Sequence, residues 1–160
     1  MAENLASRVY RGITSPFRLL PDFIIIGGKK CGTSSLYNYL VEHPDVEPAF
    51  RKEVHFFDRT SRLGTLRYRA HFPISARKRR AKRERGSEFM TGEATPYYLF
   101  HPLAPKRVRR MVPGAKLIAL LRNPVDRAYS HYHHEESRGT EPLSFEEAIE
   151  REAGRLDGER

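Results

Sequence analysis

A single stretch near the start of the chain limits what this sequence can fold into. Residues 23–26 are four apolar residues, three of them β-branched, which indicates a short buried strand. Two glycines and two lysines follow, and then Gly32, Thr33 and two serines lead into a segment with helical spacing. A strand that turns through glycines into a helix presents unpaired N–H groups and the positive end of the helix dipole. The stretch therefore predicts an anion-binding loop.

The spacing within this loop differs from that of a nucleoside triphosphate-binding loop, which reads G-x-x-x-x-G-K-[ST]. Gly27 and Gly32 have the required separation and Ser34 stands at the hydroxyl position, but Thr33 stands where the lysine should be. A lysine lies upstream instead, at Lys30, so we expect it to approach a ligand from the turn. This argues against an ordinary ATPase or kinase. A P-loop nucleotide or small-molecule kinase is kept as the alternative enzyme.

The stretch resembles the 5′-phosphosulfate-binding loop of sulfotransferases that use 3′-phosphoadenosine 5′-phosphosulfate (PAPS). The nearest likeness is to the heparan sulfate N- and 3-O-sulfotransferases and their bacterial relatives. The resemblance implies that Lys30 stabilises the leaving oxygen of the donor while the loop holds its 5′-phosphate. The donor contacts that it implies come from Lys29, Lys30, Cys31, Gly32, Thr33, Ser34 and Ser35.

A second block, K-E-V-H-F-F-D over residues 52–58, resembles a segment of the heparan sulfate 3-O-sulfotransferases. The resemblance implies that Glu53 is the general base and His55 its auxiliary. Such a base is needed because an alcohol is a poor nucleophile until its proton is being removed. Without the resemblance, an isolated glutamate is more often solvated than catalytic.

A third block, over residues 121–132, resembles the family's 3′-phosphate motif. It implies that Arg122, at the end of a strand, and Ser130, about two helical turns along, hold the 3′-phosphate. Sulfuryl transfer of this kind needs no metal, and the cluster of His131, His133 and His134 lacks the spacing of a known zinc site. We therefore expect PAPS as donor substrate and no metal.

One position departs from the heparan-type pattern. Those enzymes carry a lysine between the glutamate and the Ser or Thr of a Glu-Lys-Ser/Thr segment, and this chain has Ala94 between Glu93 and Thr95. The substitution puts a heparan-like acceptor in doubt without weakening the expectation of PAPS. A glycan, a lipid, and a small alcohol or amine all stay open as acceptors.

The order of the predicted elements indicates an α/β fold with three layers and a central parallel sheet, resembling P-loop folds. Residues 1–21 are expected to be a loosely ordered leader with one amphipathic turn at 5–13, and residues 22–160 an N-terminal part of a sulfotransferase domain. Strands are expected within 23–26, 88–98 and 116–121, the last covered on both faces. Helices are expected from the loop to His43, at 66–72, 103–111 and 125–137, and from a capping box of Ser144 with Glu147.

The charge of the chain is concentrated in one run. The net charge is +9 over 160 residues, and residues 77–85 hold seven bases and one acid. One hypothesis is that this run borders the acceptor cleft and attracts an anionic acceptor, or an anionic surface bearing it; the alternative is a solvated loop. A nucleic-acid-binding module is disfavoured because no aromatic platform accompanies the bases. A remnant that binds nucleotide without turnover is the remaining alternative.

The apolar runs are far shorter than the ~20 residues of a membrane-spanning helix. Arg8, Arg11 and Arg18 interrupt the start of the chain, which does not read as a secretory signal. The single cysteine, Cys31, excludes an internal disulfide. We therefore expect a cytoplasmic enzyme; the sequence does not indicate its oligomeric state.

Overall fold

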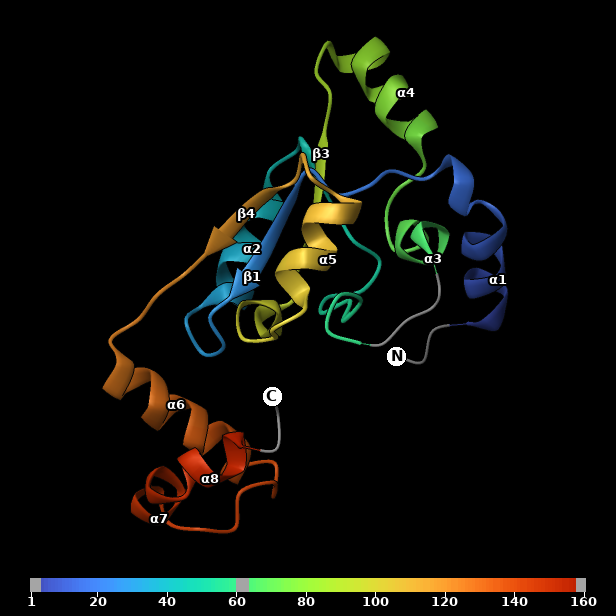
Figure 1. Cartoon of the computed structure of the whole chain (residues 1–160). Helices are drawn as coiled ribbons and strands as arrows, with labels where there is room; N and C mark the ends of the chain where they lie inside the picture. The colour runs from blue at the N-terminus through green and yellow to red at the C-terminus, as the bar shows by residue number, and fades with distance from the viewer. Residues whose placement is uncertain (1–3, 60–63, 158–160) are drawn as a thin grey trace.

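The computed structural model describes residues 4–59 and 64–157 (Figure 1), and within them the centre of the fold is a parallel sheet. Its strand order is β2-β3-β1-β4, with all neighbouring pairs parallel. The strands are β1 (Phe23–Gly27), β2 (Val46–Pro48), β3 (Met90–Ala94) and β4 (Lys116–Ala119). The predicted α/β fold with a central parallel sheet is confirmed.

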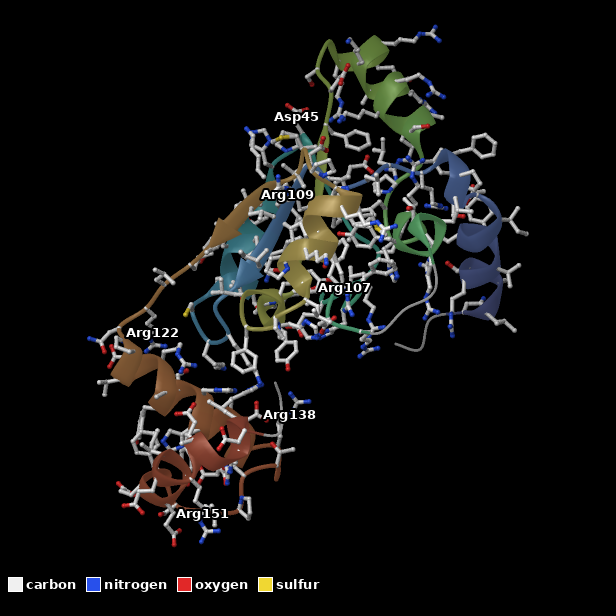
Figure 2. The ribbon with its side chains drawn as sticks, in the orientation of Figure 1. Asp45, Arg107, Arg109, Arg122, Arg138 and Arg151 are labelled. Carbon is white, nitrogen blue, oxygen red and sulfur yellow. The ribbon has the colours of Figure 1, made fainter. Side chains whose placement is uncertain are left out.

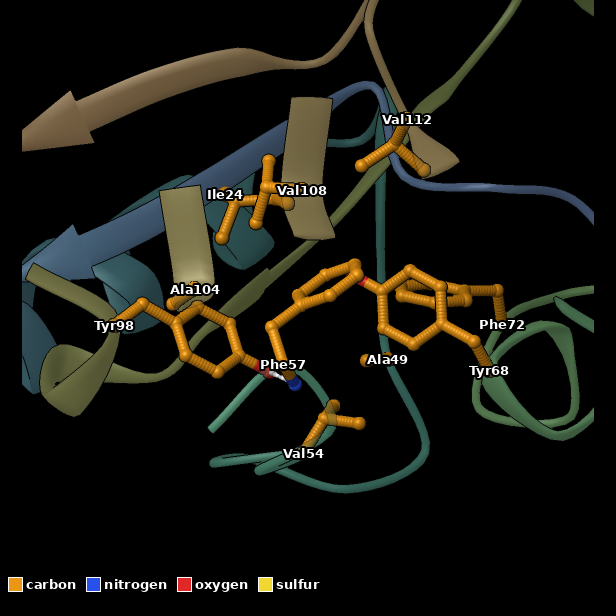
Figure 3. Close-up of a cluster of buried hydrophobic side chains, with 10 residues drawn as sticks. All are labelled: Ile24, Ala49, Val54, Phe57, Tyr68, Phe72, Tyr98, Ala104, Val108 and Val112. Carbon is orange, nitrogen blue, oxygen red and sulfur yellow. Dashed lines mark hydrogen bonds between the residues drawn. The ribbon is translucent and has the colours of Figure 1, made fainter. Parts of the chain in front are cut away.

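Strand β1 forms the centre of the core because its side chains alternate between two buried faces. Phe23 and Ile25 pack with helix α2 (Thr33–Glu42) on one face. Ile24 packs on the other face with Val108 of helix α5 (Ala104–Met111). Figure 3 shows this second cluster, in which aromatic side chains fill the space below α5. The two helices and the sheet make the three layers that the sequence predicts.

The aromatic cluster brings together segments that are distant in the sequence. Phe57, Tyr68 and Phe72 are fully buried, and Tyr68 meets Phe57 and Phe72 edge-on, with ring centroids 4.8 and 5.0 Å apart. Tyr68 belongs to α3 (Thr65–Arg69), which is shorter than the helix predicted at 66–72. The packing joins α3 to the loop that follows β2.

Local signals in the sequence predicted the helix ends correctly. Helix α2 ends at Glu42, with His43 as its C-cap before a proline. Helix α6 (Pro124–Glu136) begins after Asn123, whose side chain accepts hydrogen bonds from two backbone N–H groups of the first turn. The predicted capping box opens α7 (Phe145–Glu150), and α8 (Glu152–Leu156) follows.

The prediction that residues 116–121 are covered on both faces is wrong. Strand β4 is an edge strand of the sheet, and Leu117 and Leu121 are exposed. The chain leaves β4 for α6, which lies away from the sheet with α7 and α8 (Figure 1). An apolar run therefore indicated a strand here but not its burial.

The basic run forms most of helix α4 (Ser75–Arg85), which ends at Gly86 with a left-handed φ of 75°. The helix leads into the amino end of β3. Its side chains bind residues just before the other strands: Lys78 contacts Asp22 at 3.4 Å and Arg85 donates to the Pro44 carbonyl at 3.1 Å. Because the strands are parallel, this edge lies opposite the anion loop, which follows the carboxyl end of β1. The basic run therefore does not border the loop after β1.

Residues 4–21 are more ordered than a loose leader. They form α1 (Leu5–Ile13) and a 3-10 turn, η1 (Ser15–Phe17). The buried guanidinium of Arg18 explains the order, because it donates to the Phe72 carbonyl at 2.8 Å and to the Thr14 hydroxyl at 2.8 Å. The same group lies over the rings of Tyr10 and Phe50.

We expect Arg18→Leu to destabilise the chain by about 2–3 kcal/mol, because it leaves a buried carbonyl without its charged donor. Arg109→Leu on the exposed side of α5 is the matched control and should change stability by no more than about 0.5 kcal/mol. The measurement is urea unfolding followed by circular dichroism. Equal midpoints for the two variants would show that Arg18 does not anchor the segment.

Candidate functional site

The candidate site lies where loops from several strands meet at the carboxyl edge of the sheet. The Gly28 N–H donates to the Leu120 carbonyl at 2.8 Å, which joins the loop after β1 to the end of β4. The Glu53 N–H donates to the Ala94 carbonyl at 3.1 Å, which holds the loop after β2 against the end of β3. In the strand order, β2 and β3 lie on one side of β1 and β4 lies on the other. In open α/β sheets, ligands usually bind in the crevice at the carboxyl end of a strand whose successors lie on opposite sides in this way.

The loop over residues 28–32 has the geometry of an anion site. Gly32 is the N-cap of α2, with a left-handed φ of 85°, and it has no side chain to accept the N–H groups of the first turn. Thr33 at the start of that turn is buried, whereas Ser34 and Ser35 are exposed. The Cys31 N–H closes the turn by donating to the Gly28 carbonyl at 3.2 Å.

The two lysines of the loop have different surroundings. The Lys29 ammonium lies 2.7 Å from the Glu135 carboxylate on α6, so its charge is already paired. The hydrogen bonds from Lys29 and from Thr140 lower the pKa of Glu135 to about 2. His131 lies 3.3 Å from the same carboxylate, and burial lowers the pKa of this imidazole. Lys29 therefore connects the loop to α6, a contact that the sequence did not indicate.

The segment 52–58 brings its acidic and imidazole groups together. The His55 Nε2 lies 3.3 Å from the Glu53 carboxylate, and its Nδ1 lies 2.5 Å from the carboxylate of Asp58. Asp58 is largely buried and orients the ring, as a second carboxylate often orients a catalytic imidazole. This contact of Asp58 was not predicted from the sequence, although its i,i+3 spacing from His55 was a signal.

Backbone strain coincides with the predicted catalytic residues. Among the described residues, three that are not glycine have a positive φ: Lys30 at 65°, Glu53 at 58° and His55 at 52°. Such conformations cost about 1–3 kcal/mol each, and they persist where the surrounding structure fixes them. The three residues that the sequence marks as catalytic are therefore the ones held in strained conformations.

A buried carboxylate supports this strained segment. Glu93 of β3 is fully buried and accepts hydrogen bonds from the hydroxyls of Tyr68 at 2.6 Å, Thr95 at 2.7 Å and Tyr98 at 3.3 Å. The backbone of Val54 also hydrogen-bonds to it. Burial raises the pKa of Glu93 despite these bonds, and it raises the pKa of both tyrosines further.

The hydroxyls around Glu93 also hold the backbone of the segment. The Thr95 hydroxyl accepts from the His55 N–H at 3.4 Å. The Tyr98 hydroxyl accepts from the Phe56 N–H at 2.9 Å and from the Phe57 N–H at 3.4 Å, the second of which joins two residues labelled in Figure 3. Each hydroxyl thus accepts from the segment and donates to Glu93. No pattern in the sequence indicated this network.

The segment also touches the anion loop directly, because the Lys52 ammonium donates to the Ser34 hydroxyl. The third predicted block, residues 121–132, makes a longer contact with the anion loop. Arg122 is exposed at the start of α6 (Figure 2), with its guanidinium 3.5 Å from the Lys30 carbonyl. Ser130 is half-buried on the same helix, next to His131. The structure thus brings Arg122 to the loop, and it puts Ser130 on the helix that Lys29 holds.

The described residues contain no group of three His, Cys, Asp or Glu side chains that could hold a metal ion. In the same residues we find no helix with the length and apolar character required to cross a membrane.

Comparison with known proteins identifies the family. A family model described as "Sulfotransferase domain" matches residues 20–156. The chain is 36% identical over 140 residues to "Membrane-associated sulfotransferase kil1" of Dictyostelium discoideum, covering 84% of this chain and 28% of that protein. It is 40% identical over 115 residues to human "Heparan sulfate glucosamine 3-O-sulfotransferase 6", covering 72% of this chain and 30% of that protein.

A solved structure agrees with the family match. The crystal structure of a sulfotransferase from Alicyclobacillus acidocaldarius matches with a TM-score of 0.66 and 36% identity, covering 88% of this chain and 60% of that one. The chain therefore belongs to the sulfotransferase family. It spans about three tenths of the length of the two relatives above.

We expect the stability of the wild-type chain relative to Glu93→Gln to fall as the pH rises above 4.5, the ordinary pKa of a glutamate. A carboxyl with a raised pKa in the folded chain favours folding when protonated, and that contribution is lost as the pH rises through the folded pKa. The slope is about 1.4 kcal/mol per pH unit within that window. Urea unfolding across a pH series measures it.

Glu88→Gln provides a control of opposite sign. Glu88 is exposed, and its hydrogen bond with Lys82 lowers its pKa. The wild-type chain should therefore gain stability relative to this variant as the pH rises through the range just below 4.5. A difference between wild type and Glu93→Gln that does not change with pH would contradict the raised pKa of Glu93.

Proposed function

We propose that this chain binds PAPS at the carboxyl edge of its sheet and transfers the sulfuryl group to a hydroxyl or amine of an acceptor. One observation carries the proposal: three loops converge there, and the strained residues Lys30, Glu53 and His55 all lie on them. Strain of this kind is concentrated at active sites. Membership of the sulfotransferase family supports the same reaction.

The donor's 5′-phosphosulfate would occupy the loop over residues 28–35. Backbone N–H groups from Cys31 to Ser35 and the hydroxyls of Thr33 and Ser34 would hold its phosphate oxygens. Lys30 would neutralise the charge that develops on the oxygen between phosphorus and sulfur. Lys29 would contribute through its ion pair with Glu135, because that contact holds α6 against the loop.

The 3′-phosphate would bind Arg122 and Ser130. A guanidinium offers several donors to phosphate oxygens, and Arg122 is exposed beside the loop. For Ser130, support comes from its position on α6, the helix that Glu135 ties to Lys29.

In the transfer step the acceptor oxygen or nitrogen attacks sulfur in line with the bond to the leaving phosphate oxygen. The new bond to sulfur forms as the old S–O bond breaks, and the electron pair stays on the phosphate oxygen. Glu53 takes the acceptor's proton, and His55 orients that carboxylate from 3.3 Å. Asp58 fixes the imidazole from its other side.

The acceptor class is the part of the proposal that rests most on relatives. Several relatives are named as heparan sulfate sulfotransferases, which favours a glycan. Ala94 lies fully buried in the sheet where heparan-type enzymes carry a lysine, so this chain lacks one cation on that side. We therefore propose a glycan acceptor that need not be heparan sulfate.

We expect the chain to bind adenosine 3′,5′-bisphosphate at least about tenfold more tightly than ADP, because a charge-assisted contact to the 3′-phosphate is worth about 1.5–3 kcal/mol. Isothermal titration calorimetry measures both affinities. Arg122→Gln should remove the preference, whereas Arg138→Gln, near the C-terminal end of α6, should leave it (Figure 2). Equal affinities in the wild-type chain would favour a kinase-like or other nucleotide site instead.

We expect Lys30→Ala and Glu53→Gln to separate donor binding from proton removal. Lys30→Ala should weaken PAPS binding and transfer together, because Lys30 contacts the donor. Glu53→Gln should reduce transfer by about 10²–10⁴-fold with PAPS affinity unchanged, since the base contacts the acceptor. Assays use labelled PAPS, with Lys106→Ala and Glu42→Gln as exposed controls. Near-normal turnover in Glu53→Gln would exclude it as the base.

A further inference from the structure

Helix α1 is amphipathic, and its apolar side faces away from the protein. Leu5, Val9 and Ile13 follow one another at intervals of four residues and are 73%, 52% and 73% exposed. Phe17 of η1, four residues after Ile13, is 68% exposed. No residue of α1 is buried. We call these four residues the apolar stripe.

Arg11 is the residue of α1 whose side chain turns toward the protein, and it is half-buried. The guanidinium of Arg11 lies 5.1 Å from the centre of the Phe50 ring, and Thr14 just after the helix accepts a hydrogen bond from Arg18. A surface helix usually buries its apolar side in the core. The reversed orientation leaves a contiguous apolar surface in water, which is the mark of an interaction site.

Helix α3 lies next to this segment. The Arg69 guanidinium donates to the Pro16 carbonyl at 3.0 Å, so α3 packs beside η1. Leu66 of α3 is exposed, as is its neighbour Arg67. The start of α4 is joined to the same region, because Arg18 pairs with Ile74 in an isolated antiparallel bridge. Figure 1 shows α3 beside α1 at the right of the molecule, with α4 above them.

The positive charge of the chain is concentrated in the segments that form α1, α3 and α4. Residues 4–21 and 64–86 hold twelve of the 29 lysines and arginines but one of the 20 acidic residues, Glu84. These two segments therefore carry +11, and the rest of the chain carries −2. Some of the bases are paired, for example Arg77 with Glu47. Within the described part of the chain, Arg8, Arg67, Arg79 and Arg83 form no ion pair with an acidic side chain.

We propose that this side of the protein is a membrane-binding surface for anionic lipid. The apolar stripe lies in the boundary between headgroups and acyl chains, and the bases of α1, α3 and α4 contact lipid phosphates. A soluble polyanion would use the bases but would leave the apolar stripe in water. A bilayer with negative headgroups satisfies both features, which is why we choose it over a polysaccharide. The proposal is independent of the function proposed for the carboxyl edge.

Vesicle co-sedimentation tests the proposal, with vesicles of phosphatidylcholine containing phosphatidylserine and vesicles of phosphatidylcholine alone. We expect binding to the anionic vesicles that is at least about tenfold tighter than to the neutral ones. The triple variant Leu5→Gln, Val9→Gln and Ile13→Gln should lose at least about tenfold of that affinity, because it removes most of the stripe. Its thermal midpoint should stay near the wild-type value, since none of the three side chains is buried.

Matched controls distinguish an effect of the apolar stripe from non-specific effects of surface hydrophobicity and of net charge. Leu117→Gln, Leu121→Gln and Val125→Gln remove three equally exposed apolar residues from another part of the surface and should leave vesicle binding unchanged. Changing the four unpaired arginines above to glutamine should abolish the preference for anionic vesicles. Changing Lys106, Arg109, Arg110 and Arg138 to glutamine should preserve most of it.

Fluorescence gives an independent measure of insertion, because the chain contains no tryptophan. Phe17→Trp should shift its emission to the blue when anionic vesicles are added. Tyr39→Trp, at a position equally exposed on α2, should not shift.

Three results would overturn the proposal. The stripe variant would bind anionic vesicles as tightly as the wild type if the stripe took no part. Binding to heparin without binding to vesicles would assign the surface to a polyanion. A dimer in analytical ultracentrifugation that the stripe variant dissociates, again without vesicle binding, would assign it to a second copy of the chain.

Discussion

The buried carboxylate of Glu93 is the group on which both the core and the candidate site depend. An unsatisfied carboxylate in the interior is costly, so its position is tolerated only with a full set of donors. Tyr68, Thr95 and Tyr98 provide them from α3, from the end of β3 and from η2 (Pro96–Leu99). Moving any of these segments would leave a buried polar group unpaired. The network therefore fixes their relative positions more strictly than apolar packing does.

The same network explains how the segment 52–58 keeps left-handed backbone at Glu53 and His55. Two such residues within three positions cost about 2–6 kcal/mol together, and they persist only where the surrounding structure fixes them. The Glu53 N–H is bound by the Ala94 carbonyl and the His55 N–H by the Thr95 hydroxyl. Both acceptors belong to the end of β3, directly beside Glu93. The hydrogen bonds to the end of β3 thus help to offset the free-energy cost of the strained backbone.

Structural features that depend on a few neighbouring residues could be predicted from the sequence. The turn from β1 into α2, the ends of α2 and α6 and the capping box of α7 were predicted correctly, because glycine, proline and capping side chains act locally. The role of Glu93 was not predictable, since its partner Tyr68 lies 25 residues away and a single glutamate in a strand usually faces water. The exposure of β4 was missed for a related reason. An apolar run indicates a strand, but its place in the sheet depends on strand order.

The parallel sheet also keeps the two charged regions of the molecule apart. The anion loop lies at the carboxyl edge, whereas α4 leads into the amino edge, where Lys78 and Arg85 meet Asp22 and Asp45. A strand of five residues spans about 16 Å at ~3.3 Å per residue. This exceeds the Debye length of about 8 Å at physiological salt, so the field of α4 is largely screened at the loop. If both proposals above hold, a partner bound to the basic side leaves the loop free to bind the donor, whose affinity would then depend on the lysines and amides of the loop itself.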